Sequence, residues 1–431
     1  MVSVLIASVP IHGHVTPLLA VARHLVARGD DVRFLTGSRF ADAVATTGAR
    51  HIALTGLADY DDRVDINARF PQRARLTGAR AVAFDVEHLF INPGVLQCHN
   101  VVAAHAAQPI DVVLADSAFA GGAFLLGYPR ATRPPVVMCS GLPLGLSSRD
   151  TAPFGLGIPP ARWGNRPRNA VLTWLTRPVL ASATRRADRL YRELHNCSMP
   201  FSVHDWAAHA DAIVQFTVPA FEYPRSDAPP HLRFAGPLSA RGSHAPKPDW
   251  WADLDGSTPV VHVTQGTFAN KDYSQLIVPT LEAMSCEDVL VVVTTGGRPV
   301  DTLPPLPANA RAADYLSYDE LLPLTSAFVT NGGYGGVQYA LRYGVPIVAT
   351  GGKEDKPEVG ARVRWSGVGR QIRRERPNVR QLHSAITTVL NDERYRRASR
   401  RVAADMASSG GYSVLTDVID GLVATPRSAC S

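Results

Sequence analysis

Two histidines and one aspartate have the types and positions needed to move a proton. His12 and His14 lie in "VPIHGHVTP" (residues 9–17), directly after the apolar run near the start of the chain. Histidine titrates near neutral pH, so either could be the base that deprotonates an attacking hydroxyl. Asp116 closes a second apolar run, "IDVVLAD" (residues 110–116), where it could orient an imidazole. Metal ligation and simple hydrogen bonding to the loop backbone are the alternatives for the histidines.

Glycines are concentrated in another stretch, "FVTNGGYGGVQYALRYGVPIVAT" (residues 328–350). Gly332, Gly333, Gly335 and Gly336 fall where an apolar run gives way to a helical pattern. Glycine weakens the start of a helix by up to ~1 kcal/mol per residue relative to alanine. Missing side chains, however, let an anion reach the free amides at the positive end of a helix. We therefore predict a phosphate cradle over residues 331–336, with tight turning and close helix–sheet packing as the alternative.

A second turn of this kind is "VTQGTFANKD" (residues 263–272). Gly266 and Thr267 offer a backbone amide and a hydroxyl just after an apolar run. Open α/β sheets bind ligands at the carboxyl ends of their strands, and two such loops favour a diphosphate. The chain has neither the Walker lysine pattern nor an ordered GxGxxG followed by a ribose-binding acid, which argues against kinase and NAD-dependent functions.

These residues require strands that alternate with helices. Apolar runs predict strands at residues 2–9, 32–36, 110–115, 136–139, 260–264, 289–295, 327–330 and 345–350. Thr16 and Pro17 are typical of the cap and the first position of a helix, which would leave both histidines on the preceding loop. Residues 393–423 read as helical. The alternation predicts an α/β fold with two Rossmann-like, doubly wound domains.

The length of 431 residues also favours two domains. Residues 1–236 are expected to form the first domain and residues 259–407 the second. Residues 237–258, rich in Pro, Gly, Ser and charge, are expected to link them, and a helix near residues 408–431 to pack back on the first. Residues 57–101 and 142–201 are long, less regular excursions, where variable binding surfaces usually lie.

Composition limits the classes of protein. A chain with 45% hydrophobic and 19% charged residues fits a globular protein, and its net charge of +6 is scattered, so a nucleic-acid partner is not expected. The five cysteines form no CxxC pair, which fits a reducing cytoplasm. We expect no signal peptide and no integral membrane segment. We also expect no metal site, because the acidic pairs at residues 59–61 and 253–255 follow no core strand. The chain is expected to be a monomer or homodimer.

Two stretches make a family resemblance specific. These are "GHVTPLLAVARHLVARGDDVRFLT" (residues 13–36) and "DYLSYDELLPLTSAFVTNGGYGGVQYALRYGVPIVATGGKEDKP" (residues 314–357). The chain resembles GT-B glycosyltransferases of the family 1 type, including bacterial enzymes that act on macrolides and other natural products. The resemblance implies a cleft between the domains and inverting, metal-independent transfer of a hexose. A nucleotide sugar would be the co-substrate, a UDP-hexose in preference to a dTDP-sugar, and no cofactor is expected.

The resemblance also assigns roles to individual residues. It implies that His14 is the catalytic base and that Asp116 orients it. Tyr315 stands where the family commonly has a base-stacking tryptophan, and Asn331 where a histidine usually contacts the diphosphate. Asp355 matches a sugar-binding acid. The implied donor site comprises Gly266, Thr267, Tyr315, Asn331, Gly332, Gly333, Gly335, Gly336, Gln338, Asp355 and Lys356.

Acceptor contacts are expected from the excursions of the first domain. We predict that they include His12, Phe84, Phe90, Phe119, Leu142 and Phe154. Apolar and aromatic side chains of this kind suit a bulky hydrophobic acceptor, such as a macrolide or polyketide aglycone, although core packing would also explain them. A nucleotide-sugar 2-epimerase and a non-catalytic partner protein of the same fold are the alternative functions.

Overall fold

A computed structural model of the chain describes residues 1–238, 245–266, 270 and 272–424. Within these residues, seven parallel strands form a first sheet in the order β3-β2-β1-β4-β5-β6-β7. Their bounds are β1 Ser3–Ala7, β2 Asp31–Thr36, β3 Arg50–Ala53, β4 Val112–Asp116, β5 Val136–Ser140, β6 Ala212–Gln215 and β7 Leu232–Phe234. The order reverses direction beside β1, which makes the sheet doubly wound.

Six further parallel strands form a second sheet in the order β10-β9-β8-β11-β12-β13. They are β8 Val260–Thr264, β9 Leu290–Thr294, β10 Ala310–Ala313, β11 Ala327–Thr330, β12 Ile347–Thr350 and β13 Gly369–Ile372. All eight strands expected from apolar runs are present. The prediction of an α/β fold with two doubly wound sheets is therefore confirmed. The strands that were not predicted, such as β7 and β10, are short or carry exposed side chains.

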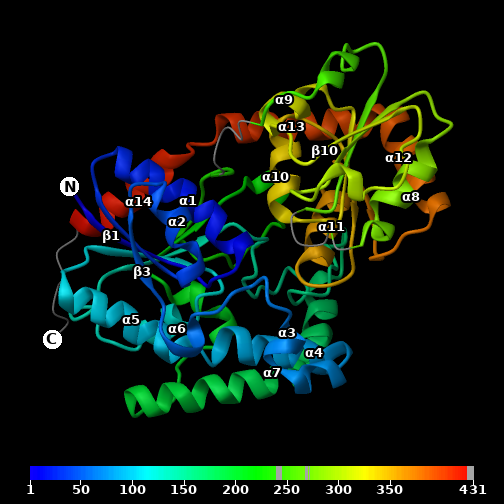
Figure 1. Cartoon of the computed structure of the whole chain (residues 1–431). Coiled ribbons are helices and arrows are strands. Elements are labelled where there is room, and N and C mark those ends of the chain that lie inside the picture. The colour runs from blue at the N-terminus through cyan, green and yellow to red at the C-terminus, as the bar shows by residue number, and fades with distance from the viewer. Residues whose placement is uncertain (239–244, 267–269, 271, 425–431) are drawn as a thin grey trace.

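Helices cover both faces of each sheet (Figure 1). The helices along the first part of the chain are α1 His12–Ala27, α2 Ala41–Ala45, α3 Ile66–Arg69, α4 Gly78–Asp85, α5 Gly94–Ala107, α6 Gly121–Leu125 and α7 Asn165–His195. Those along the rest are α8 Ile277–Met284, α9 Tyr318–Leu321, α10 Tyr334–Arg342, α11 Lys356–Trp365, α12 Val379–Asn391, α13 Glu393–Ser408 and α14 Tyr412–Ala424. Side chains of β1 alternate between two cores, with Leu5 on one face and Val4 on the other.

Two features differ from the helices that the sequence predicts, whereas the packing of the last helix on the first sheet agrees with the expectation. The segment 393–423 is two helices, because Ser409 and Gly411 interrupt it and Gly411 has a φ of +57°. The last helix, α14, packs on the first sheet through Leu415 and Ile419 and lies beside α1 in Figure 1. The excursion 142–201 contains the long helix α7 rather than irregular chain. Among the described residues, no helix is both long enough and apolar enough to span a bilayer.

The start of α1 is the correction that matters most for the site. The helix begins at His12, so His12 and His14 lie in its first turn, and Pro17 is inside it. The carboxylate of Asp62 accepts a hydrogen bond from the His12 amide at 2.7 Å, and the Thr16 hydroxyl donates to the His12 carbonyl at 2.8 Å. A helix terminus must satisfy such free amides, and here a loop fifty residues away does so. That partner cannot be read from the local pattern.

Candidate active site

His14 and Asp116 form a hydrogen-bonded pair. Asp116 is the last residue of β4, which neighbours β1, so its side chain emerges at the sheet edge where α1 begins. Nδ1 of His14 lies 2.9 and 3.0 Å from the two carboxylate oxygens of Asp116, and both side chains are nearly buried. A proton on Nδ1 donates to the carboxylate, which leaves Nε2 with a lone pair. The pair therefore has the geometry of a general base and the acid that orients it.

The surroundings of His14 favour its charged form. Burial by itself lowers the pKa of His14, but the charge and hydrogen bond of Asp116 outweigh it, and Asp355 and Asp62 act in the same direction. The pKa of His14 consequently lies above its ordinary value. For His12 burial prevails, and its pKa lies below the ordinary value, with Asp62 raising it and Arg39 lowering it. Of the two histidines, His14 has the carboxylate that stabilises a newly formed imidazolium.

The glycine loop joins β11 to α10. Gly332 has a φ of +90°, and a β-carbon there would lie 2.6 Å from the Thr350 carbonyl, so the turn itself requires this glycine. Gly333 is the N-cap of α10, and no side chain caps the helix. Among the described residues, a β-carbon on Gly335 would meet no atom within 4 Å, and one on Gly336 would touch Phe328 alone. Gly333 and Gly335 therefore border open space at a helix start whose amides are not capped.

Asn331 ties this loop to the one after β8. Its side-chain amide donates to the Gln265 carbonyl at 2.6 Å. Next to Gln265, Gly266 has a φ of +74°, and its amide donates to the Thr264 hydroxyl at 3.2 Å. The two loops therefore lie side by side at one edge of the second sheet, as the sequence predicts. Thr267, the remaining site residue of this turn, lies outside the described residues.

Tyr315 presents an aromatic face at the same edge. Its side chain is 54% exposed, and its hydroxyl donates to the Gly296 carbonyl at 3.0 Å. A β-carbon on Gly297 would lie 2.5 Å from the Tyr315 hydroxyl oxygen, so the ring rests on the turn that follows β9. The ring is thus fixed along one side while much of its surface remains accessible.

Asp355 and Lys356 lie where the loop after β12 enters α11. Burial and the charge of Glu354 raise the pKa of Asp355 to about 6, although Lys356 and His14 oppose the shift. Lys356 pairs with Glu354 at 2.9 Å, and its stem covers the loop, because a β-carbon on Gly332 would lie 3.4 Å from the Lys356 β-carbon. Asp355 raises the pKa of His14 and His14 lowers that of Asp355, so the two charges act on each other although they lie on elements of different sheets.

Gln338 corrects the predicted donor site. Its side chain is 4% exposed, and the Thr217 hydroxyl donates to it at 3.1 Å. Thr217 follows β6 of the first sheet, so Gln338 is part of the contact between domains rather than a surface open to a ligand. Its place in the predicted donor site came from the family resemblance alone. On α10, the position buries its side chain.

The predicted acceptor residues divide by exposure. Phe119 is fully buried in the first-domain core, so it offers no surface to a ligand, and this assignment is wrong. Phe84 and Phe90 are partly buried, and the Phe84 ring stacks on His88 with centroids 3.8 Å apart. Leu142 is also partly buried, and its carbonyl accepts a hydrogen bond from Gln215. Phe154, 47% exposed, is the predicted acceptor residue with the most accessible surface.

The acidic run at residues 59–61 is expected to be solvated charge rather than a metal site. Asp59 accepts from the Ser38 amide and Asp61 pairs with the exposed Arg63. The adjacent Asp62 accepts from the His12 amide at the start of α1 and pairs with Arg39 at 2.9 Å. Tyr60, between Asp59 and Asp61, is partly buried, and its hydroxyl has no hydrogen-bond partner. Asp62 therefore supports the histidine end of α1. Across the described residues, no three His, Cys, Asp or Glu side chains converge as they would to hold a metal ion.

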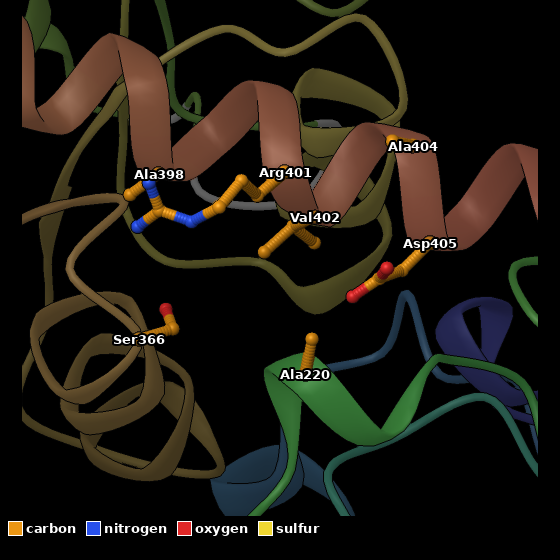
Figure 2. Close-up of a pocket in the computed structure, with 7 residues that line it drawn as sticks. All are labelled: Ala220, Ser366, Ala398, Arg401, Val402, Ala404 and Asp405. Carbon is orange, nitrogen blue, oxygen red and sulfur yellow. The ribbon is translucent and has the colours of Figure 1, made fainter.

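A pocket lies beside helix α13. It has a volume of about 320 Å³ and is lined by α13 residues including Arg401 and Asp405, with Ser366 and Ala220 opposite (Figure 2). None of the predicted site residues lines it. Its floor contains small and apolar side chains, and it contributes nothing to the arrangement around His14.

The two doubly wound sheets, with the His14–Asp116 pair at the edge of one and the glycine loop at the edge of the other, have the GT-B glycosyltransferase fold. Residues 279–423 match the family described as "Erythromycin biosynthesis protein CIII-like, C-terminal domain". The chain is 40% identical over 427 residues to "4'-demethylrebeccamycin synthase" of Lentzea aerocolonigenes, covering 97% of this chain and 99% of that protein. It therefore belongs to this family of natural-product glycosyltransferases.

Another glycosyltransferase and a solved glycosyltransferase structure are also similar to this chain. The chain is 34% identical over 440 residues to "UDP-glycosyltransferase 2" of Phaeomoniella chlamydospora, covering 98% of this chain and 96% of that one. A solved structure titled "Spinosyn Rhamnosyltransferase SpnG complexed with thymidine diphosphate" superimposes with a TM-score of 0.69 at 18% identity, covering 97% of this chain and 100% of the other. At that identity the likeness concerns the fold.

Proposed function

We propose that the protein transfers a hexose, with inversion and without a metal, from a nucleotide sugar to a hydroxyl of a bulky hydrophobic small molecule. The observation that carries the proposal is the hydrogen-bonded His14–Asp116 pair, whose histidine also feels the charge of Asp355 from the other sheet. A base on one side and a sugar-binding acid on the other are what a single in-line displacement needs.

The steps follow from the side chains. Nε2 of His14 takes the proton of the acceptor hydroxyl as the oxygen attacks the anomeric carbon, and Asp116 stabilises the imidazolium. The bond to the diphosphate breaks on the opposite face, so the configuration inverts. The amides of the α10 start, at Gly333 and Gly335, stabilise the charge of the leaving diphosphate.

Other loops at this edge bind the remaining parts of the donor, its nucleobase and its sugar. Tyr315 provides a face on which the nucleobase stacks, and Asp355 accepts hydrogen bonds from sugar hydroxyls. We favour a UDP-hexose over a dTDP-sugar, in line with the name of the relative from P. chlamydospora, whereas the spinosyn structure contains thymidine diphosphate. Phe154, Phe84 and Phe90 offer the apolar surface for the acceptor.

The test is a transfer assay scored by mass spectrometry. Purified protein is mixed with UDP-glucose or dTDP-glucose and a panel of macrolide, polyketide and flavonoid-like aglycones, with and without EDTA. The proposal expects a mass gain of one hexose on an aglycone, an inverted anomeric centre by NMR, and no effect of EDTA. Retention of configuration or loss of transfer in EDTA would contradict the mechanism. A donor inverted at C2, formed without an acceptor, would indicate the epimerase instead.

A further inference from the structure

Arg362, Glu222 and Glu358 are buried together where the two domains meet, and the buried Arg225 pairs with Glu222 beside them at 3.7 Å. Arg362 of α11 donates from Nε and Nη2 to Glu222 at 3.0 and 2.9 Å, and from Nη1 to Glu358 at 2.9 Å. Glu222 follows the short helix Pro219–Phe221 on the first-domain side. Arg362 and Glu222 are each 1% exposed and Glu358 is 5% exposed. Burial favours the neutral guanidine, yet the charge of Glu222 raises the pKa of Arg362 above its usual value.

The cluster holds one particular stretch of the first domain. Residues 141–157, here called the bridging segment, run between β5 and α7. Near its beginning, the Leu144 amide donates to Glu222 at 2.9 Å, and the Leu144 carbonyl accepts from Arg362 at 3.2 Å. At its end, the amides of Gly155 and Gly157 donate to Glu358 at 2.9 and 2.7 Å. Every member of the cluster therefore bonds the bridging segment.

The two ends of the bridging segment touch the two elements that carry the chemistry. A β-carbon on Gly141 would lie 2.8 Å from the ring of Pro17, one turn after His14 on α1. A β-carbon on Gly157 would lie 2.6 Å from the carbonyl of Pro357, two residues after Asp355. Gly157 has a φ of +59°, which permits this close approach. The bridging segment thus spans from the helix of His14 to the helix that follows Asp355, and it carries Phe154.

We propose that Arg362 is a positioning residue for glycosyl transfer: with Glu222 and Glu358 it clamps the bridging segment to α11, which fixes Asp355 opposite His14 and holds Phe154 over the acceptor. The inference rests on the site assigned under the proposed function. Arg362 touches neither substrate and acts through the segment and the helix that it joins.

Burying charged side chains costs desolvation free energy. We therefore expect the Arg362 cluster to have a role other than stabilising the contact between the domains. Desolvation offsets much of the attraction in a buried ion pair, and apolar side chains often give equal stability. What the cluster adds is geometry, because the planar guanidinium bonds two carboxylates and a carbonyl in fixed directions. Without the guanidinium, Glu222 keeps its pairing with Arg225 at 3.7 Å and Glu358 keeps the amides of Gly155 and Gly157, but nothing of the cluster would join the two carboxylates.

The test compares Arg362→Lys and Glu358→Gln with Arg33→Lys. Arg33 is a matched control, because it is 2% exposed and bonds backbone carbonyls within the first domain. Hydrogen exchange of the full-length protein, read by mass spectrometry on peptides covering residues 142–160, reports the clamp without any substrate. We expect faster exchange there in both test variants and no change in the control.

The second readout is the partition of the donor between transfer and hydrolysis, measured with UDP-glucose or dTDP-glucose and an aglycone that the native protein modifies. We expect Arg362→Lys to lower the transfer-to-hydrolysis ratio by up to about 100-fold, the cost of a misplaced reacting group, and to raise the acceptor KM more than the donor KM. Arg33→Lys should lower thermal stability and leave the ratio unchanged.

Two results would overturn the proposal. Unchanged exchange in residues 142–160 would show that the cluster does not hold the segment. Faster exchange with an unchanged ratio and acceptor KM, per folded molecule, would make the cluster structural only. A native protein that transfers no hexose would instead count against the proposed function, and the exchange experiment would still decide whether the clamp exists.

Discussion

Asp355 lies close enough to His14 for each charge to shift the pKa of the other, although the two residues belong to different domains. The relationship links His14 on α1 to the loop that precedes α11.

Replacing Asp116 with asparagine should lower the pH at which the enzyme becomes active. His14 must be neutral to accept a proton, so activity should rise with pH through its pKa, which Asp116 holds above the ordinary value. Without that charge, the acid limb of the kcat profile should move down by about 1 to 3 pH units, while the maximal rate falls. An acid limb that does not move would mean that another group titrates.

Replacing Asp355 with asparagine should change stability and donor binding in opposite directions. The folded pKa of about 6 exceeds the ordinary value of 3.8, so ionisation costs folding free energy as pH rises through this interval. At pH 7 the variant should be more stable by up to about 3 kcal/mol, with no gain below pH 4. Its donor KM should nevertheless rise. Thermal melts at both pH values and steady-state kinetics check the pair of effects.

Tyr315 should contribute to donor affinity but little to folding, because more than half of its side chain is exposed. Loss of a stacked nucleobase costs about 1 to 3 kcal/mol, so Tyr315→Ala should weaken donor binding by about 5- to 150-fold. Tyr315→Phe keeps the aromatic face and should bind nearly normally. Calorimetric titration with UDP and with dTDP compares the two variants. Equal affinity of Tyr315→Ala and the native protein would remove Tyr315 from the site.

Replacing Gly332 or Gly335 of the predicted phosphate cradle with alanine should have different effects, the first on stability and the second on donor binding. Gly332→Ala places a side chain at a φ of +90° and against the Thr350 carbonyl, so it should destabilise the fold by at least about 1 to 2 kcal/mol. Gly335→Ala meets no atom within 4 Å and should keep or slightly raise stability. The added methyl group should still weaken donor binding, because it occupies the approach to the helix amides. Unaltered donor affinity in Gly335→Ala would place the diphosphate elsewhere.

Local patterns were sufficient where a residue's environment is set by its own strand. Buried parallel strands read as apolar runs, and the residue that closes such a run lies at the carboxyl edge of the sheet. This logic placed Asp116 near His14 and brought the loops of Gly266 and Asn331 together. The order of the strands within each sheet was not predicted, because it depends on pairings between strands that are distant in sequence.

Partners distant in sequence account for what the patterns missed. The helix α1 begins at His12, earlier than predicted, and the Asp62 carboxylate accepts a hydrogen bond from the His12 amide. The Thr217 hydroxyl donates to Gln338, which therefore contacts the other domain instead of a ligand. Phe119 was indistinguishable in sequence from an exposed aromatic residue such as Phe154, because both lie outside a clear periodic pattern. The pairing of Arg362 with Glu222 spans 140 residues, and neither residue lies in a stretch whose composition signals burial.

Replacement of His14 with alanine is the most direct test of its proposed role as the base. Donor binding by calorimetry and transfer by mass spectrometry would be measured for His14→Ala, with His24→Ala, on the same helix, as the control. If His14 is the base, the variant should keep native donor affinity with kcat reduced by about 10²- to 10⁴-fold, and the control should change little. Transfer by His14→Ala within about 10-fold of the native rate, well short of that range, would contradict this role.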